Sequence, residues 1–435
     1  MQRQHKQVRL LMALVYMAFA FAYRIMMIPP GVNDSHLPDL TGDLMMNYDI
    51  VSEIIGAKSI LDGSFSMYVG RYSRDIIPNG VVLPYPPLTA YLQTPIVYVG
   101  TRLGLDPFGM TMFMICGLPY IVLGALCALQ AGYVLRKCLG VSDEMTITAT
   151  VFLILFSSLM FWVVTYAARF EYVAALFLLL AMSALGSNRY GLAGICLGLS
   201  LMTKQLALPA VMAFVIVALF GALRKEIELR KAFLLLVTIP IPFVMLVPFY
   251  IASPEGVREG MLKTPSLFPI MHVSFVNLCA QVGKLVFEER AVGEFLKLHS
   301  NSIILLLCVG YILAVVKSKR LRMDSSRFCA LAGLASFLLV ILTKYTYIDK
   351  YSVPASVFVI LWGASRKPGF PYDALWFVVL QSFILDHVPV IWKQYVGLIF
   401  YSMVFAYVHY MAFTGSDNKL TIADSREPPP EVVGP

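Results

Sequence analysis

Long apolar runs recur from near the N-terminus almost to the C-terminus, with short polar or basic stretches between them. The runs fall near residues 10–28, 110–135, 146–165, 171–186, 190–203, 206–222, 232–251, 300–316, 327–343, 351–364, 373–390 and 394–413. A helix needs roughly 20 apolar residues to cross a bilayer, and several runs reach that length. The pattern predicts an all-α integral membrane protein with about eleven to thirteen transmembrane helices.

The composition agrees with this pattern. The chain has 435 residues, of which 59% are hydrophobic and only 14% are charged, so a water-soluble protein of this length would lack polar surface. The run 10–28 is followed by Pro29 and Pro30 instead of a small-residue cleavage site, which favours a retained span over a signal peptide. We expect one polytopic membrane domain over residues 1–435.

Basic residues lie between the apolar runs, and their positions predict the orientation of the chain in the membrane. The clusters are Arg3 with Lys6 and Arg9, Arg136-Lys137, Arg189, Arg224-Lys225 with Arg230-Lys231, Lys317 to Arg322, and Arg366-Lys367. One orientation places all of them in the cytoplasm, as the positive-inside rule requires. The net charge of +8 is therefore an orientation signal, and no nucleic-acid partner is expected.

Two loops on the opposite, non-cytoplasmic face are longer than the others. They cover residues 29–108 and 253–299, and both mix apolar with polar residues. We expect short helices lying in the membrane interface at 49–61 and 273–287, so these loops are the predicted working parts. The polar tail 414–435 is predicted to be disordered and cytoplasmic.

The cysteines predict neither a disulfide framework nor a metal site. The seven cysteines lie mostly inside or at the ends of apolar runs, with no CxxC and no paired spacing. They are typical of small buried residues. No cluster has the spacing of a dedicated divalent-cation site, so no metal and no cofactor are expected.

Several charged residues fall on the non-cytoplasmic face, against the general bias. These are Arg71, Arg74, Arg169, Lys204, Lys263, Lys344 and Lys350. Charged groups at span ends are expensive enough to suggest a function, although Lys and Arg side chains can also reach the interface along their apolar stems. Asp43 precedes the predicted helix 49–61, where a helix N-terminus favours a carboxylate, and it could equally serve only as a cap.

Four short motifs follow one another in a recognisable order. They are Gly42-Asp43, YPPLTAY from Tyr85 to Tyr91, RFEY at 169–172 and TKQLAL at 203–208. Their order and spacing resemble the GT-C superfamily of membrane glycosyltransferases, most closely the dolichyl-phosphate-glucose-dependent glucosyltransferases that extend the lipid-linked oligosaccharide of N-glycosylation. The corresponding stretches there read GD, DYPPLTAYH, HFQYN and FKQMAL. The likeness covers most of the chain in architecture and is most specific in YPPLTAY.

The resemblance implies an inverting transfer of glucose or mannose from a dolichyl- or polyprenyl-phosphate sugar to a lipid-linked or extracytoplasmic glycan acceptor. The residue that matches the family's catalytic aspartate is Asp43, and Asp49 is the alternative base. A carboxylate in that position removes the acceptor proton, which is worth roughly 10²–10⁴-fold in rate. Candidate cations for the donor phosphate are Arg169, Lys204, Lys350, Arg71 and Arg74, and candidate substrate-positioning residues are Tyr85, Glu171, Gln205 and Asp349.

The sequence departs from the family at two positions. Ile348 stands where the family's HEK motif has His, and Pro84 stands where Asp precedes YPP. These departures leave open a related polyprenyl-phosphate-mannose enzyme or a catalytically inactive scaffold with the same fold. A multi-pass transporter or lipid flippase is the alternative from another class, although we find no internal repeat of the kind common in transporters.

The likeness to eukaryotic enzymes favours the endoplasmic reticulum membrane with a lumenal active site. The sequon Asn33-Asp34-Ser35 is compatible with a lumenal loop. A prokaryotic plasma membrane with an outward-facing site would give the same pattern. The expected partners are the lipid-linked donor, the glycan acceptor and membrane lipids.

Overall fold

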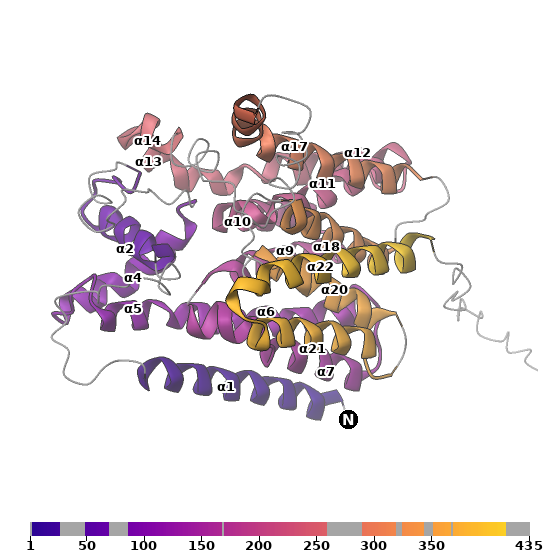
Figure 1. The fold of residues 1–435 in the computed structure, drawn as a ribbon, viewed down its shortest axis with the longest axis horizontal. Helices are drawn as coiled ribbons and strands as arrows, with labels where there is room; N and C mark the ends of the chain where they lie inside the picture. Colours follow the sequence, from indigo (N-terminus) through magenta and orange to yellow (C-terminus); the bar gives the residue numbers. More distant parts are fainter. Residues whose placement is uncertain are drawn as a thin grey trace, which may run out of the picture.

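The computed structural model describes residues 2–26, 48–68, 86–167, 169–258, 289–318, 324–342, 351–366 and 369–414. All regular elements in these ranges are helical (Figure 1). The first half contains α1 (Gln2–Met26), α2 (Tyr48–Leu61), α4 (Leu88–Arg102), α5 (Met110–Cys116), α6 (Leu118–Lys137), α7 (Glu144–Leu155), α8 (Ser158–Met160), the π-helix η2 (Phe161–Tyr166), α9 (Glu171–Gly186), α10 (Tyr190–Thr203) and η3 (Gln205–Ala207). The second half contains α11 (Leu208–Leu223), α12 (Leu229–Thr238), η4 (Ile241–Leu246), α13 (Val247–Ala252), α14 (Pro254–Arg258), α17 (Glu289–Lys317), α18 (Ser325–Leu342), α20 (Val353–Ser365), α21 (Tyr372–His387), α22 (Val390–His409) and η6 (Tyr410–Thr414).

Within the described residues, 8 helical stretches are long and apolar enough to cross a membrane. They are Gln2–Met26, Thr111–Lys137, Glu144–Tyr166, Gln205–Leu223, Leu229–Ala252, His299–Lys317, Ser325–Leu342 and Trp392–Thr414. Shorter apolar helices at Glu171–Gly186, Tyr190–Thr203 and Val353–Ser365 add to them. The all-helical, multi-pass character predicted from the apolar runs is thus supported, whereas the number of spans stays a prediction.

Small residues allow the helices to pack closely. Gly194 and Gly198 are spaced four apart on α10, and a Cβ atom on either would lie 2.2–2.3 Å from a backbone carbonyl oxygen, of Leu235 or Ile239. The bare backbone of α10 therefore rests directly on α12 and the residue that follows it. Close backbone approach through a small-xxx-small spacing is a common way for helices to associate in lipid.

At least three of the predicted spans are divided into shorter helical segments, and one of them, the run 146–165, forms α7, α8 and η2. The run 232–251 forms α12, η4 and α13 in succession, and Pro240, Pro242 and Pro248 lie along this stretch. Proline has no N–H to donate and its ring clashes with the preceding turn, so a continuous α-helix is not available. The run 110–135 is divided at Gly117, between α5 and α6.

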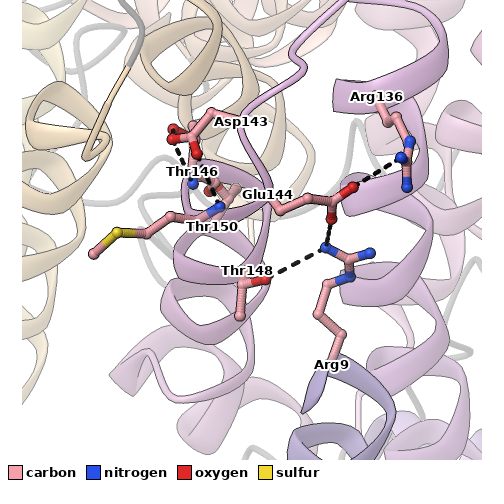
Figure 2. Close-up of polar contacts among 8 residues, drawn as sticks. Arg9, Arg136, Asp143, Glu144, Thr146, Thr148 and Thr150 are labelled. Atoms are coloured by element: carbon pink, nitrogen blue, oxygen red, sulfur yellow. Dashed lines mark hydrogen bonds and ion pairs between the residues drawn. The ribbon is translucent and has the colours of Figure 1, made fainter. Parts of the chain in front are cut away.

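Basic residues of two helices, Arg9 of α1 and Arg136 of α6, meet near the end of the bundle that carries the N-terminus. Figure 2 shows Glu144 of α7 between two arginines, with Arg9 Nη1 and Arg136 Nη2 each 2.8 Å from one of its carboxylate oxygens. Asp143 caps α7 by accepting hydrogen bonds from the N–H groups of Met145 and Thr146, each at 3.1 Å. We call this end of the bundle the basic end; the predicted common cytoplasmic side of the clusters stays a prediction.

The opposite end of the bundle is covered by helices from the two predicted loops. In Figure 1, α2 and α4 lie with α13 and α14 at the end far from the N-terminus. Met67, Tyr68, Ala90, Phe249 and Val257 form one buried apolar cluster that joins these segments. Burial raises the pKa of the Tyr68 phenol, which is therefore neutral. We call this the loop end.

A helix is present as α2 where one was predicted at 49–61, and its location in the membrane interface stays a prediction. The second predicted interfacial helix, 273–287, and the tail beyond Thr414 lie outside the described residues. The interfacial helix at 273–287 and the disorder of the tail therefore stay predictions.

Candidate functional site

Four of the predicted site residues are described with their side chains. They are Arg169, Glu171, Lys204 and Gln205, all near the ends of α9 and α10. Asp49 lies in the first turn of α2, without a described side chain. Six further candidates lie outside the described residues, namely Asp43, Arg71, Arg74, Tyr85, Asp349 and Lys350.

Lys204 and Glu171 form a buried ion pair. Lys204 Nζ lies 2.5 Å from Glu171 Oε1, and their side chains are 4% and 1% exposed. Glu171 belongs to the first turn of α9, where the helix N-terminus favours a carboxylate, and Lys204 is the extended residue that ends α10. Ending the helix at Lys204 and beginning the next at Gln205 turns the chain back into the bundle, which leaves the lysine facing α9.

Aromatic rings enclose the ammonium group of this pair. Lys204 Nζ lies 4.7 Å from the ring centroid of Phe170 and 6.0 Å from that of Tyr351. Such contacts stabilise a cation by about 0.5–2 kcal/mol, more when water is excluded. Tyr351 directly follows Lys350 in the sequence, so the stretch after the predicted Asp349-Lys350 motif reaches this pair.

Arg169 stands immediately before Phe170 and Glu171 and is 3% exposed. Its backbone N–H donates to Val163 O at 2.8 Å, across the end of the π-helix η2. A π-helical turn is rare and often marks a functional position, because it reshapes the backbone that follows. The structure thus places Arg169 next in sequence to Phe170 and Glu171, the two residues that contact Lys204 Nζ. Gln205 opens η3 next to Lys204 and is half-buried.

A buried carboxylate that the sequence reasoning missed lies in α2. Glu53 is 0% exposed; its Oε2 accepts a hydrogen bond from Tyr120 OH and lies 3.4 Å from Gln93 Nε2. Gln93 Nε2 also donates to Cys116 O at 2.8 Å. The sequence shows a charged residue, Glu53, among the apolar residues of this predicted helix, and this was the only sign of a special position. The burial of Glu53 depends on its tertiary contacts, which the local sequence does not show.

Glu53 is connected to the Lys204 pair through two rings. The centroids of Tyr120 and Phe170 are 6.1 Å apart, and Phe170 lies under Lys204 Nζ. The helix of the first loop is therefore fixed to the same aromatic contact that holds the ion pair.

Buried charged groups of both signs define the chemistry available here. Among the described residues, the buried side chains of Arg169, Lys204 and Glu171 contribute two cations and one carboxylate to a region shielded from water. Coulomb attraction is several-fold stronger there than in bulk water. Glu171 Oε2 is buried and has no hydrogen-bond partner among the described residues, so it can accept a hydrogen bond from a hydroxyl group.

Metal ligands do not cluster in the described part of the chain, where no group of three His, Cys, Asp or Glu residues could hold an ion. No family model, no curated protein and no solved structure matches the chain.

Proposed function

We propose that the protein is a membrane glycosyltransferase that transfers a hexose, glucose or mannose, from a polyprenyl- or dolichyl-phosphate carrier to a glycan acceptor. The observation that supports this most is the buried ion pair of Lys204 and Glu171 beside Arg169. These residues occupy the RFEY and TKQ motifs, and they lie 33 residues apart in sequence. Structural contact between the two motifs is what a shared site requires.

The reaction proceeds by attack of an acceptor hydroxyl oxygen on the anomeric carbon of the donor. A new C–O glycosidic bond forms while the bond from that carbon to the phosphate oxygen breaks, and the phosphate leaves with the electron pair. Asp43 takes the hydroxyl proton as the bond forms. Attack from the face opposite the phosphate inverts the anomeric configuration.

The two cations favour the transition state over the bound donor. The donor phosphate diester carries one negative charge, and the departing phosphate gains a second as the bond breaks. Fixed positive groups in a water-excluded site stabilise this developing charge more than the ground-state charge. Arg169 and Lys204 supply those groups, and Glu171 holds the lysine in place and offers its second oxygen to a sugar hydroxyl.

The location of the pair suits a lipid-linked substrate. Its residues end α10 and begin α9, helices of the apolar bundle, and α2 of the first loop is joined to them through Tyr120 and Phe170. A polyprenyl chain can lie in the membrane while its phosphate and sugar reach the loop end. We place this end in the lumen of the endoplasmic reticulum or outside a prokaryotic plasma membrane.

The test is a transfer assay with purified protein in liposomes. Radiolabelled polyprenyl-phosphate glucose, mannose and arabinose are offered in turn with lipid-linked oligosaccharide acceptors, and the product is analysed for its anomeric configuration. We expect transfer from glucose or mannose with inversion. Glu171→Gln should lower transfer strongly, whereas Glu144→Gln, which alters an ion-paired carboxylate at the basic end, should not.

Two outcomes would overturn the proposal. One is the absence of transfer from every donor by well-folded protein, as a scaffold subunit would show. The other is uptake of a solute or movement of a lipid across the same liposomes without any transfer, as a transporter or flippase would show.

A further inference from the structure

Arg24 occupies the last turn of α1 and is 1% exposed. Its guanidinium makes four hydrogen bonds, all to backbone carbonyl oxygens. Nε donates to Met114 O at 3.0 Å and Nη2 to Phe113 O at 3.1 Å, while Nη1 donates to Thr165 O at 3.0 Å and to Tyr166 O at 3.3 Å. No carboxylate among the described residues pairs with it. These hydrogen bonds join the end of α1 to the backbone of α5 and η2.

Gly117 makes room for this group. A Cβ atom at position 117 would lie 2.3 Å from Arg24 Cζ and 2.5 Å from Arg24 Nε. Real Cβ atoms are not found at such distances, so any other residue would push the guanidinium from its carbonyls. The break between α5 and α6 at Gly117 and the buried arginine thus depend on each other.

The four carbonyls belong to two segments that lead into the candidate site. Thr165 and Tyr166 are the last residues of the π-helix η2, and Arg169 follows three positions later. Phe113 and Met114 lie in the last turn of α5, which ends at Cys116, and Cys116 O accepts a hydrogen bond from Gln93 Nε2. Gln93 in turn contacts Glu53 of α2.

We propose that Arg24 is a positioning residue that fixes Arg169 relative to the first-loop helix α2. It acts by tying the end of η2 to the end of α5 through one guanidinium. The inference rests on the proposed function for its consequence in catalysis, because Arg169 is there a ligand of the donor phosphate. The geometry that carries it, a single buried group bonded to both segments, is independent of the reaction.

Arginine is suited to this task for two reasons. A π-helical end leaves carbonyl oxygens without the regular helical partner, and the guanidinium offers five donors in a rigid planar fork. A lysine in its place would offer a compact ammonium that reaches fewer of the four oxygens. A displacement of a catalytic ligand by about 1 Å can reduce the rate by roughly 100-fold.

The experiment compares Arg24→Gln, Arg24→Lys and Gly117→Ala with two matched controls in the full-length protein. Arg9→Gln removes another buried arginine from the same helix, at the basic end, where it pairs with Glu144. Gly310→Ala adds a methyl group at a helical glycine with nothing within 4 Å. Each variant is assayed for kcat and donor KM per folded molecule, and for backbone hydrogen exchange over residues 161–171.

We expect Arg24→Gln and Gly117→Ala to lower kcat by roughly 10–100-fold with a smaller change in KM. Exchange over 161–171 should be faster in both, and Arg24→Lys should be intermediate in both measurements. Arg9→Gln and Gly310→Ala should leave kcat, KM and this exchange as in the wild type.

The two proposals fail in different ways. If the wild-type protein transfers no sugar, the proposed function fails, and hydrogen exchange over 161–171 still decides whether Arg24 orders this segment. If the wild type is active and Arg24→Gln changes kcat no more than Arg9→Gln does, Arg24 is a structural residue only. Unchanged exchange over 161–171 in Arg24→Gln would overturn the positioning role regardless of activity.

Discussion

Replacing Lys204 by methionine separates the structural and the catalytic roles of the buried ion pair. The side chain keeps its length and apolar stem but loses its charge, so the carboxylate of Glu171 is left buried at 1% exposure without its partner. The contact of the ammonium with the Phe170 ring at 4.7 Å is lost as well. Stability and sugar transfer should both fall.

The expected loss of stability follows from the burial of both groups. Removing one partner of a buried pair costs about 3–5 kcal/mol, because the other charge stays in a poor solvent. An unfolding entropy of about 2.1 cal/mol/K per residue scales to roughly 0.9 kcal/mol/K for this chain, so Tm should fall by roughly 3–5 °C. The chain has 435 residues, which is why a large free-energy change gives a modest shift.

The double variant Glu171→Leu with Lys204→Met removes the uncompensated charge. Replacing a whole buried pair by apolar side chains is often neutral or stabilising by about 1–4 kcal/mol. Tm should therefore return to the wild-type value or exceed it. Transfer should remain at least about 100-fold below wild type, because a group that stabilises the developing phosphate charge is still missing.

Thermal unfolding in detergent can be followed with a thiol-reactive dye. Cys116, Cys127, Cys196, Cys308 and Cys329 are free and buried, so their reaction with the dye reports loss of structure. Transfer is measured on the same preparations below Tm. A double variant that is stable and fully active would refute the catalytic role of the pair, and a single variant as stable as wild type would refute its burial.

Four further outcomes are expected. Asp43→Asn should leave the protein folded and inserted but abolish transfer, and undiminished transfer would remove Asp43 as the base. Glu144→Gln should cost about 1.5–3 kcal/mol through lost charged hydrogen bonds, seen as a lower Tm with turnover per folded molecule unchanged. Hydrogen bonds from the Thr146 hydroxyl and from backbone N–H groups hold the pKa of Asp143 below its ordinary 3.8. The stability that the Asp143 carboxylate contributes is therefore present above that pH and is lost as the pH falls through the folded-state pKa. The Tm difference between wild type and Asp143→Ala should be constant from pH 7 to about 5 and shrink below about 4. Transfer should survive dialysis against a chelator, because side-chain cations hold the donor phosphate, and activity that returned only with added divalent ions would contradict this.

Much of the fold could be predicted because hydropathy dominates in this chain. The apolar runs and the helix at 49–61 could be predicted from the pattern of apolar residues. The helix α2 begins and ends within one residue of that prediction. The breaks in the helices inside these apolar runs were not predicted, because the length of a run was given more weight than the prolines within it. Pro240, Pro242 and Pro248 lie in one apolar stretch, and its length suggested a single continuous span.

The candidate site was predictable only in part. Arg169 and Lys204 were selected because both fall at turns on the predicted outer face. In the structure, Arg169 lies just before the first residue of α9 and Lys204 just after the last residue of α10. Arg24 and Glu53 were missed because each lies in a helix whose sequence looks ordinary. Their burial depends on partners more than 60 residues away, such as Thr165 and Tyr120, and no local pattern records such contacts. The prediction that Asp43 lies near Arg169 and Lys204 stays open, since Asp43 is outside the described residues.

A structure of the protein with a non-transferable polyprenyl-phosphonate hexose tests the central claim most directly. We expect the phosphonate within about 4 Å of the cationic group of Arg169 or Lys204, the distance of an ion pair, with the sugar toward the first loop. A phosphonate bound at the basic end near Arg9 and Arg136, or at no defined position in a well-ordered protein, would contradict it.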